Sequence, residues 1–250
     1  MSHIHIDKVF KTYPGNPPVQ ALQDIQLDIA PGEFVALLGP SGCGKSTLLN
    51  LVASFEPLTS GTLTVAGQTV SAPGPDRGVV FQEAALFPWL SVWENVVFGP
   101  KAQGQSPSQY KERAEQMLEL VGLSDFKHHL PIQLSGGMRQ RVGIARVLTL
   151  GSKVLLMDEP FGALDAQTRL SMQELLLSVW DKLKPTVIFV THDIDEALFL
   201  ADTVHVMSAR PGRIQTTIKV NLERPRSIDV TATAAFNEMK LSVLRTIRGH

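Results

Sequence analysis

Residues 39–47 constrain the fold of this chain more than any other stretch, because they require a strand, a tight turn and a helix to meet at one point. They read Gly-Pro-Ser-Gly-Cys-Gly-Lys-Ser-Thr, which fits Gly-x4-Gly-Lys-[Ser/Thr], and they follow the apolar run Phe34–Leu38. Glycines at this spacing let successive backbone N–H groups turn inward around an anion, and the helix that begins near Lys45 directs the positive end of its dipole at the same place. The stretch therefore predicts a phosphate-binding loop.

Two side chains of this loop suit a nucleotide bound with Mg²⁺. Lys45 would place a mobile charge over the β- and γ-phosphates, and the Ser46 hydroxyl would be a hard oxygen ligand for the metal. Cys43 occupies a variable position of the pattern and is interpreted as a small loop filler rather than a nucleophile. The alternative is a glycine-rich turn without a ligand, which the flanking strand and helix disfavour. The predicted nucleotide-binding residues are Gly39, Pro40, Ser41, Gly42, Cys43, Gly44, Lys45, Ser46 and Thr47.

Composition limits the class of protein. The 250 residues are 44% hydrophobic, which suits a globular chain with a sizeable core. No window approaches about 18 consecutive apolar residues, and the N-terminus lacks the segments of a leader peptide, so we expect a protein that is neither secreted nor membrane-spanning. The single cysteine excludes an intramolecular disulfide and suits a reducing cytoplasm. A net charge of −1 offers no general attraction for nucleic acid.

Hydrophobic periodicity predicts two kinds of strand. Apolar and polar residues alternate over 4–10 and 22–29, which indicates an antiparallel pair joined by the turn formers of residues 14–18. Three other runs are apolar without alternation, as strands covered on both faces are. These runs are residues 34–38, 154–157 and 187–190. Each leads into a helix-like segment, and that order predicts a parallel sheet with helices on its faces.

Helical periodicity interrupts this pattern between about residues 91 and 150 and returns over 165–183, where an apolar stripe includes Trp180. We interpret that stripe as core. Two further strands are predicted at 203–207 and 214–220, and a closing helix at 236–247. The prediction is an α/β fold with a core at residues 1–87 and 151–220, a helical insert at about 88–150, and a helical tail at 221–250.

Asp158 and Glu159 stand at the end of the apolar run 154–157, where open α/β sheets bind their ligands. Asp158 suits Mg²⁺, directly or through water, and Glu159 suits activation of an attacking water. Taken alone, the pair could be a solvated loop start. Combined with the phosphate loop, it predicts the acidic residues of a nucleotide hydrolase.

Ser135, Gly136 and Gly137 form a second glycine turn, and a helix-compatible segment follows from Met138. Free N–H groups at a helix N-terminus and a hydroxyl make this turn a second candidate anion site. The alternative is a helix cap with Ser135 as the N-cap residue.

Leu134-Ser135-Gly136-Gly137 shortly before an Asp-Glu strand, in a chain with a phosphate loop, resembles the signature of ATP-binding cassette (ABC) ATPases. The resemblance runs from Ile4 to about Val220. It implies a single ABC ATPase domain: a P-loop NTPase (RecA-like) core with an N-terminal antiparallel β-subdomain and an inserted α-helical subdomain. It also implies ATP and Mg²⁺ as ligands.

The resemblance implies roles for residues at matching positions. Tyr13 matches the aromatic residue that stacks on adenine, and Gln82 matches the glutamine that reaches Mg²⁺ and the attacking water. Asp165 matches the loop that crosses to the opposite subunit, and His192 matches the histidine that contacts the γ-phosphate and orients that water. The implied catalytic residues are Glu159, His192 and Gln82, and the implied metal-binding residues are Ser46, Gln82 and Asp158. Outside the phosphate loop, the implied nucleotide-binding residues are Tyr13, Gln82, Ser135, Gly136, Gly137, Asp158 and Asp165.

In the family that the chain resembles, two cassettes pair head to tail, which would hold each ATP between Lys45 of one and Ser135 and Gly137 of the other. The resemblance therefore implies a cassette dimer, taken as a homodimer, that drives integral membrane permease subunits and acts indirectly with a solute-binding protein. The expected docking groove surrounds Gln82 and residues 84–90, where Trp89 either docks a partner helix or belongs to the core. The expected location is the cytoplasmic face of the inner membrane, as a peripheral subunit without a nucleic-acid partner.

Residues 74–83, 86–89 and 161–169 resemble the importer branch for nitrate, sulfonates and taurine. The predicted function is therefore the ATP-hydrolysing subunit of an importer for such a small anion. Alternatives are a soluble ABC ATPase that acts on ribosomes or nucleic acid, an importer for an unrelated small solute, and a nucleotide-binding regulator without turnover. The single cassette with no basic face disfavours the first of these, and intact catalytic positions disfavour the last.

Two residues depart from the family pattern. Met138 stands where many members have glutamine, although several importer cassettes share the methionine. Ser54 stands where glycine is usual after the phosphate-loop helix, and a serine favours a more ordinary φ than glycine. We therefore expect a locally different exit from this helix.

Overall fold

The computed structural model describes residues 3–248 and divides the chain into two compact units. The first unit comprises the residues up to Gly74 and those from Lys184 onward, and the second comprises Pro75–Leu183. The two units are described one at a time. No helix within residues 3–248 is both long enough and apolar enough to cross a membrane.

The first unit contains a four-stranded antiparallel sheet with the order β2-β1-β4-β5. Its strands are β1 (Ile4–Tyr13), β2 (Val19–Ile29), β4 (Ser60–Val65) and β5 (Gln68–Thr69). The predicted antiparallel pair is confirmed, because β1 pairs with β2 from Ile4 opposite Ile29 to Tyr13 opposite Val19. Alternate residues such as Ile4, Ile6 and Val9 are buried, as the alternating pattern requires.

The same unit contains parallel strands that carry the phosphate loop. Its remaining strands are β3 (Phe34–Leu38), β8 (Thr186–Thr191), β9 (Thr203–Met207) and β10 (Ile214–Lys219). Strand β3 pairs in parallel with both β8 and β9, and β10 pairs antiparallel with β9. Every residue of β3, β8 and β9 is buried, which agrees with the unbroken apolar runs at two of them. The carboxyl ends of β3 and β8 therefore lie at one edge.

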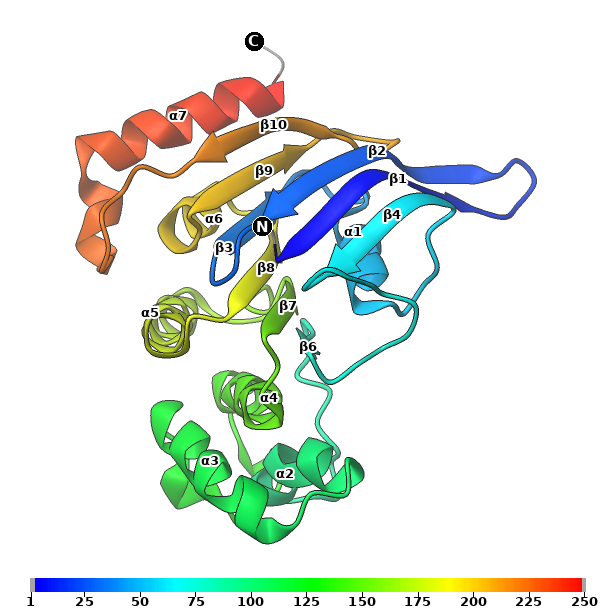
Figure 1. The fold of residues 1–250 in the computed structure, drawn as a ribbon. Helices are drawn as coiled ribbons and strands as arrows, with labels where there is room; N and C mark the ends of the chain where they lie inside the picture. The colour runs from blue at the N-terminus through cyan, green and yellow to red at the C-terminus, as the bar shows by residue number, and fades with distance from the viewer. Residues whose placement is uncertain (1–2, 249–250) are drawn as a thin grey trace. The chain divides into compact units, whose positions relative to one another are not determined.

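Three helices cover these strands. They are α1 (Lys45–Ala53), α6 (Ile194–Leu200) and α7 (Ala234–Arg248). Helix α1 packs on β8, α6 packs on β3 and β8, and α7 packs on α6 and on the short 3₁₀ helix Ile228–Ala232. Figure 1 shows α7 in red along β10. The predicted closing helix is confirmed as α7.

The second unit is mostly helical around a short parallel strand pair, β6 (Arg77–Val80) and β7 (Val154–Asp158). The helices are α2 (Val92–Ala102), α3 (Pro107–Leu120), α4 (Gly136–Leu150) and α5 (Ala166–Leu183), with 3₁₀ turns at Ser124–Phe126 and Pro131–Gln133. Helix α4 packs against α2 and α3, which are green in Figure 1, and against α5, which is yellow-green. The Trp180 stripe of α5 is core as predicted, except that Leu183 is 45% exposed where the helix ends. The boundaries of the helical insert stay a prediction.

The exit from α1 contradicts the expectation for Ser54. Ser54 is the C-cap residue of α1 with φ 59° and ψ 29°, so it adopts the left-handed conformation that glycine favours. In this conformation its backbone N–H donates to the Leu51 carbonyl at 3.0 Å, and the Phe55 N–H donates to the Asn50 carbonyl at 2.9 Å. Closing the helix end outweighs the conformational cost of a non-glycine residue, about 1 kcal/mol.

Candidate functional site

The phosphate loop joins β3 to α1 through two glycines in the left-handed region, Gly42 at φ 76° and Gly44 at φ 96°. Gly44 is also the N-cap residue of α1, and no side chain caps this helix. The first-turn N–H groups are therefore not taken by a capping side chain, which is the arrangement that an anion at a helix N-terminus requires. A Cβ atom on Gly44 would lie 2.6 Å from Leu22 Cδ2, so the loop also depends on close approach to β2.

Lys45 lies inside the loop, with only 5% of the residue exposed. Its Nζ donates to the carbonyl oxygens of Gly39 at 2.7 Å and Pro40 at 3.1 Å, and lies 3.9 Å from Cys43 Sγ. Burial raises the pKa of the Cys43 thiol, which favours the protonated, unreactive form and suits a filler. The loop thus combines a buried cation with a helix N-terminus that no side chain caps, and these residues fit the phosphates of a nucleotide.

A second loop supports the phosphate loop, and sequence reasoning missed it. It follows β9, where Arg210 Nε donates to the Gly42 carbonyl at 3.3 Å and the Gly212 N–H donates to the Ala21 carbonyl at 2.9 Å. A Cβ atom on Gly212 would overlap the Cys43 carbonyl oxygen, so only glycine fits there. The available signal was the Arg-Pro-Gly turn after the apolar strand 203–207, because β9 ends at the same edge as β3.

Tyr13, the predicted adenine-stacking residue, is half-buried at the end of β1. The ammonium of Lys11 lies 4.8 Å from the centre of its ring and forms an ion pair with Glu56 at 3.0 Å. Burial raises the pKa of Tyr13, and its hydrogen bond to Glu56 acts in the same direction. The Tyr13 ring is therefore held by Lys11 on β1 and by Glu56. Glu56 lies in the segment that leaves α1 at Ser54, so the conformation of Ser54 sets the direction of that segment.

His192 is exposed immediately after β8, at the edge where β3 enters the phosphate loop. The residues on either side of it are bound to one another. The Asp193 N–H donates to Thr191 Oγ1 at 3.0 Å, and the Asp193 side chain caps α6 by accepting from the Glu196 N–H at 3.1 Å. The first unit therefore presents the phosphate loop, Tyr13 and His192, each on a different element.

In the second unit, Asp158 is the last residue of β7, and Glu159 follows it with φ 43°. This left-handed conformation is unfavourable for a glutamate and is found where the surrounding structure or a functional role imposes it. The Glu159 carbonyl accepts from the Gly162 N–H at 3.1 Å and closes a tight turn. A Cβ atom on Gly162 would lie 3.2 Å from Gln82 Nε2. The structure thus brings Gln82 next to the turn that Glu159 begins.

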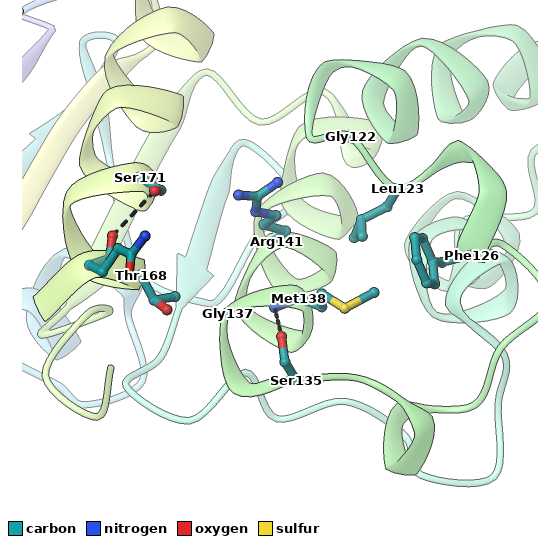
Figure 2. A pocket seen from close by; sticks show the side chains of 10 residues that line it. Gly122, Leu123, Phe126, Ser135, Gly137, Met138, Arg141, Thr168 and Ser171 are labelled. Carbon is teal, nitrogen blue, oxygen red and sulfur yellow. Dashed lines mark hydrogen bonds between the residues drawn. The ribbon is translucent and has the colours of Figure 1, made fainter. Parts of the chain in front are cut away.

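The Ser135 turn begins α4, and Ser135 is the N-cap residue that the alternative interpretation proposed. Its Oγ accepts from the Met138 N–H at 3.3 Å (Figure 2). Gly137 allows α5 to approach, since a Cβ atom there would lie 2.6 Å from Thr168 Cγ2. Asp165 begins the next helix and accepts from the Thr168 N–H at 3.0 Å and its hydroxyl at 2.7 Å. These hydrogen bonds lower the pKa of Asp165 and keep it ionised.

A cavity of about 400 Å³ opens beside this turn (Figure 2). Ser135 and Gly137 line it together with an apolar side formed by Leu123, Phe126 and Met138 and a polar side that includes Arg141. The cavity therefore offers a cation, a hydroxyl and apolar surface to one ligand. The remaining lining residues are Gly122, Gln167, Thr168 and Ser171.

The chain is similar to known proteins over nearly all of its length. A family model described as "ABC transporter" matches residues 22–162. The taurine import ATP-binding protein TauB of Rhizobium johnstonii is 53% identical over 206 residues, which cover 82% of this chain and 79% of that protein. The nitrate import ATP-binding protein NrtD of Synechocystis is 49% identical over 221 residues, with coverage of 88% and 83%.

Two solved structures support the same likeness. The ATP-binding cassette MJ0796, in a dimeric post-hydrolysis state bound to ADP and Pi, is 32% identical with a TM-score of 0.75, and the match covers 88% of this chain and 100% of that chain. The cbiO1 protein of Clostridium perfringens, part of the ABC transporter complex cbiONQ, is 27% identical with a TM-score of 0.81 and coverage of 99% and 98%.

Proposed function

The chain belongs to the ABC transporter family, and we propose that this ABC importer ATPase drives uptake of a small anion of the nitrate, sulfonate or taurine type. The observation that carries the ATPase function is the uncapped N-terminus of α1 beside the buried Lys45 ammonium. The class of solute is supported by the named nitrate and taurine import proteins, each about half identical to this chain.

The residues divide the work of hydrolysis between them. Backbone N–H groups of the loop and Lys45 would bind the phosphates, and Ser46, Gln82 and Asp158 would hold Mg²⁺. When bound, Mg²⁺ neutralises phosphate charge as it builds up. Glu159 accepts a proton from the attacking water, and His192 orients that water. Tyr13 stacks on the adenine base.

A second copy of the chain completes the nucleotide site in this proposal. Ser135 and Gly137 line a cavity that presents both Arg141 and an apolar side, which suits a phosphate-bearing ligand held by another cassette. The related cassette MJ0796 was solved as a dimer. Asp165 lies in the turn before α5, close in sequence to cavity residues, and is proposed to reach the opposite copy.

Permease subunits are proposed to dock at a groove of about 660 Å³ in the second unit, which Gln82 and Ile132 line. The adjoining surface carries Trp89, 72% exposed, with Phe87 between it and Phe98 at ring distances of 5.8 Å and 4.4 Å. Exposed aromatic clusters of this kind are typical of protein interfaces. Docking there places the chain at the cytoplasmic face of the inner membrane as a peripheral subunit, with a solute-binding protein acting through the permease.

Side chains of two helices fix the backbone of this groove. From α4, Gln140 Nε2 donates to the Phe81 carbonyl at 2.9 Å, and Arg146 donates to the carbonyls of Ala84 at 3.0 Å and Ala85 at 2.8 Å. From α2, the fully buried Asn95 accepts from the Phe87 N–H at 2.9 Å. Because α4 begins at the Ser135 turn, movement of the groove would be passed directly to that turn.

Phosphate release from Mg²⁺-ATP by the purified full-length chain tests the enzymatic part. Glu159→Gln should abolish release and yield an ATP-bound dimer in size-exclusion chromatography, because the water can no longer be activated. Only monomer at saturating ATP would contradict the shared site. Uptake of nitrate, taurine and alkanesulfonates by cells lacking the chain tests the solute, and recovery of ribosomes rather than a membrane protein as the bound partner would overturn the importer assignment.

A further inference from the structure

A partly buried hydrogen-bond network joins the residues on either side of His192. Thr191 Oγ1 donates to Glu196 Oε2 at 2.5 Å and accepts from the Asp193 N–H at 3.0 Å. Asp193 Oδ1 accepts in turn from the Glu196 N–H at 3.1 Å. The three residues thus form a closed ring of hydrogen bonds, called the Thr191 circuit, that links the residue before His192 to two residues after it.

The two anchors of the Thr191 circuit are buried while His192 is not. Thr191 is 2% exposed and Glu196 is 7% exposed, whereas His192 is exposed. A hydrogen bond between a hydroxyl and a carboxylate is strengthened in a low-dielectric environment and is costly to leave unmade. The circuit therefore holds the direction in which the exposed imidazole leaves the sheet, and the imidazole itself does not have to be buried.

The far end of α6 is held as firmly, so the helix cannot easily shift to compensate. Arg226 Nη1 donates to the carbonyls of Leu198, Phe199 and Ala201 at 3.1, 3.1 and 2.8 Å. The first turn is tied to α7 by the ion pair of Lys240 with Asp195 at 2.7 Å. A helix of seven residues has little stability alone. Its position, and hence the position of His192, depends on these contacts at both ends.

We propose that Thr191 and Glu196 are positioning residues that act on ATP hydrolysis through His192. This inference rests on the proposed role of His192 in orienting the attacking water. Neither residue is proposed to touch the nucleotide, because both are buried beneath the loop that presents His192. The Thr191 hydroxyl is the critical group, since it takes part in two of the three hydrogen bonds.

The test compares Thr191→Val, which removes the hydroxyl at nearly constant shape, with Thr191→Ser, which keeps it. Thr191→Val should lower kcat for ATP hydrolysis by the purified full-length chain about tenfold, because small displacements of a positioning group have effects of this size, and leave KM within about twofold. Thr191→Ser should stay within about twofold of wild type in both. Equal kcat for Thr191→Val and wild type would overturn the proposal.

A double-mutant cycle separates positioning from a general structural effect. In a His192→Ala background, Thr191→Val should lower kcat no further, because its effect passes through the missing imidazole. A further tenfold loss there would contradict the proposal. Thermal unfolding of each variant identifies any loss of kcat that arises because part of the protein is unfolded.

The ring ¹⁵N spectrum of His192, identified by its disappearance in His192→Ala, provides a readout that needs no turnover. The signal should shift in Thr191→Val and in Glu196→Ala and stay in place in Thr191→Ser. An unshifted signal in both of the first two variants would overturn the positioning role. If the wild-type chain released no phosphate, the proposed function would fail for the isolated chain, and the ring spectrum alone would decide the positioning role.

Discussion

The two glycine turns of this chain, residues 39–47 and 135–137, look alike in sequence but are built differently. The phosphate loop relies on its backbone: Gly42 and Gly44 have positive φ, and no side chain caps α1. The Ser135 turn has no positive φ, and Ser135 itself caps α4. One helix N-terminus is left open for an anion, whereas the other is already satisfied by its own chain.

The positively charged side chains beside the two turns also differ. Lys45 is buried within the phosphate loop and bound to that loop's own carbonyls. Beside the Ser135 turn, Arg141 lines an open cavity and donates to the Val121 carbonyl at 3.3 Å. The phosphate loop thus holds its own cation in place, while the Ser135 turn lines a cavity that is open to a second molecule. A single chain should therefore bind nucleotide through the first turn and need a second copy to use the other.

The largest effect is expected for Lys45→Ala, which removes the buried cation of the phosphate loop. ATP affinity should fall at least about 100-fold, since a charged hydrogen bond contributes about 3 kcal/mol. Isothermal titration calorimetry measures this loss. Lys182→Ala, an exposed lysine at the end of α5, is the matched control and should leave affinity unchanged. Unchanged affinity in Lys45→Ala would refute the phosphate-loop assignment.

Adding a methyl group to each turn tests the backbone difference directly. Gly44→Ala should destabilise the chain by about 2 kcal/mol, because the Cβ meets Leu22 Cδ2 at 2.6 Å and φ is 96°. Gly136→Ala has 3.6 Å to its nearest neighbour, Leu164, and should change stability by less than about 1 kcal/mol because alanine favours a helix. Urea unfolding measures both. Similar losses in the two variants would remove the contrast.

Ser135→Ala separates the capping role from a role in the shared site. The lost cap should cost about 1 kcal/mol of stability, and Ser91→Ala at the start of α2, where Ser91 Oγ accepts from the Glu94 N–H at 3.2 Å, should cost about as much. Only Ser135→Ala should also weaken ATP-dependent dimerisation while ATP binding to the single chain stays intact. Analytical ultracentrifugation of each serine variant in the Glu159→Gln background measures dimerisation and so separates the capping role from a role in the shared site. If both serine variants dimerised equally, Ser135 would be a cap and nothing more.

The smallest effect concerns the exit from the phosphate-loop helix. Ser54→Gly should raise the free energy of unfolding by about 1 kcal/mol, because glycine adopts φ near 59° without the steric cost. Removing the side chain also removes a buried hydroxyl oxygen that has no hydrogen-bond partner within residues 3–248. Thermal denaturation measures the gain. A loss of stability would mean that the serine side chain makes a contribution that its surroundings do not reveal.

Local patterns were sufficient for most elements of the fold. The apolar runs at 34–38, 154–157 and 187–190 are strands β3, β7 and β8, and the helical periodicity over 165–183 is helix α5. These features depend on periodicity and on residues next to each other in the chain. The same holds for the phosphate loop, whose conformation follows from its own glycines.

Contacts between distant segments were not predictable in this way. Nothing near Ser54 in the chain indicates that it adopts a glycine conformation, and the Arg-Pro-Gly turn at 210–212 indicates a loop without indicating that Gly212 lies against Cys43. The hydrogen bonds from Arg146 to the carbonyls of Ala84 and Ala85 likewise join segments that only folding brings together. Sequence reasoning therefore missed the contacts that support the phosphate loop and the groove of the second unit.

The sequence by itself determined the strand–turn–helix around residues 39–47 and the positions of the strands at 34–38, 154–157 and 187–190, because each depends on a few adjacent residues. Only the tertiary structure decided that Lys45 is buried against the Gly39 and Pro40 carbonyls, that Glu159 has a left-handed backbone, and that the side chains of Thr191 and Glu196 bond to each other beside His192. These features depend on how segments of the chain pack against one another. That is a property of the packed chain, and no local pattern carries it.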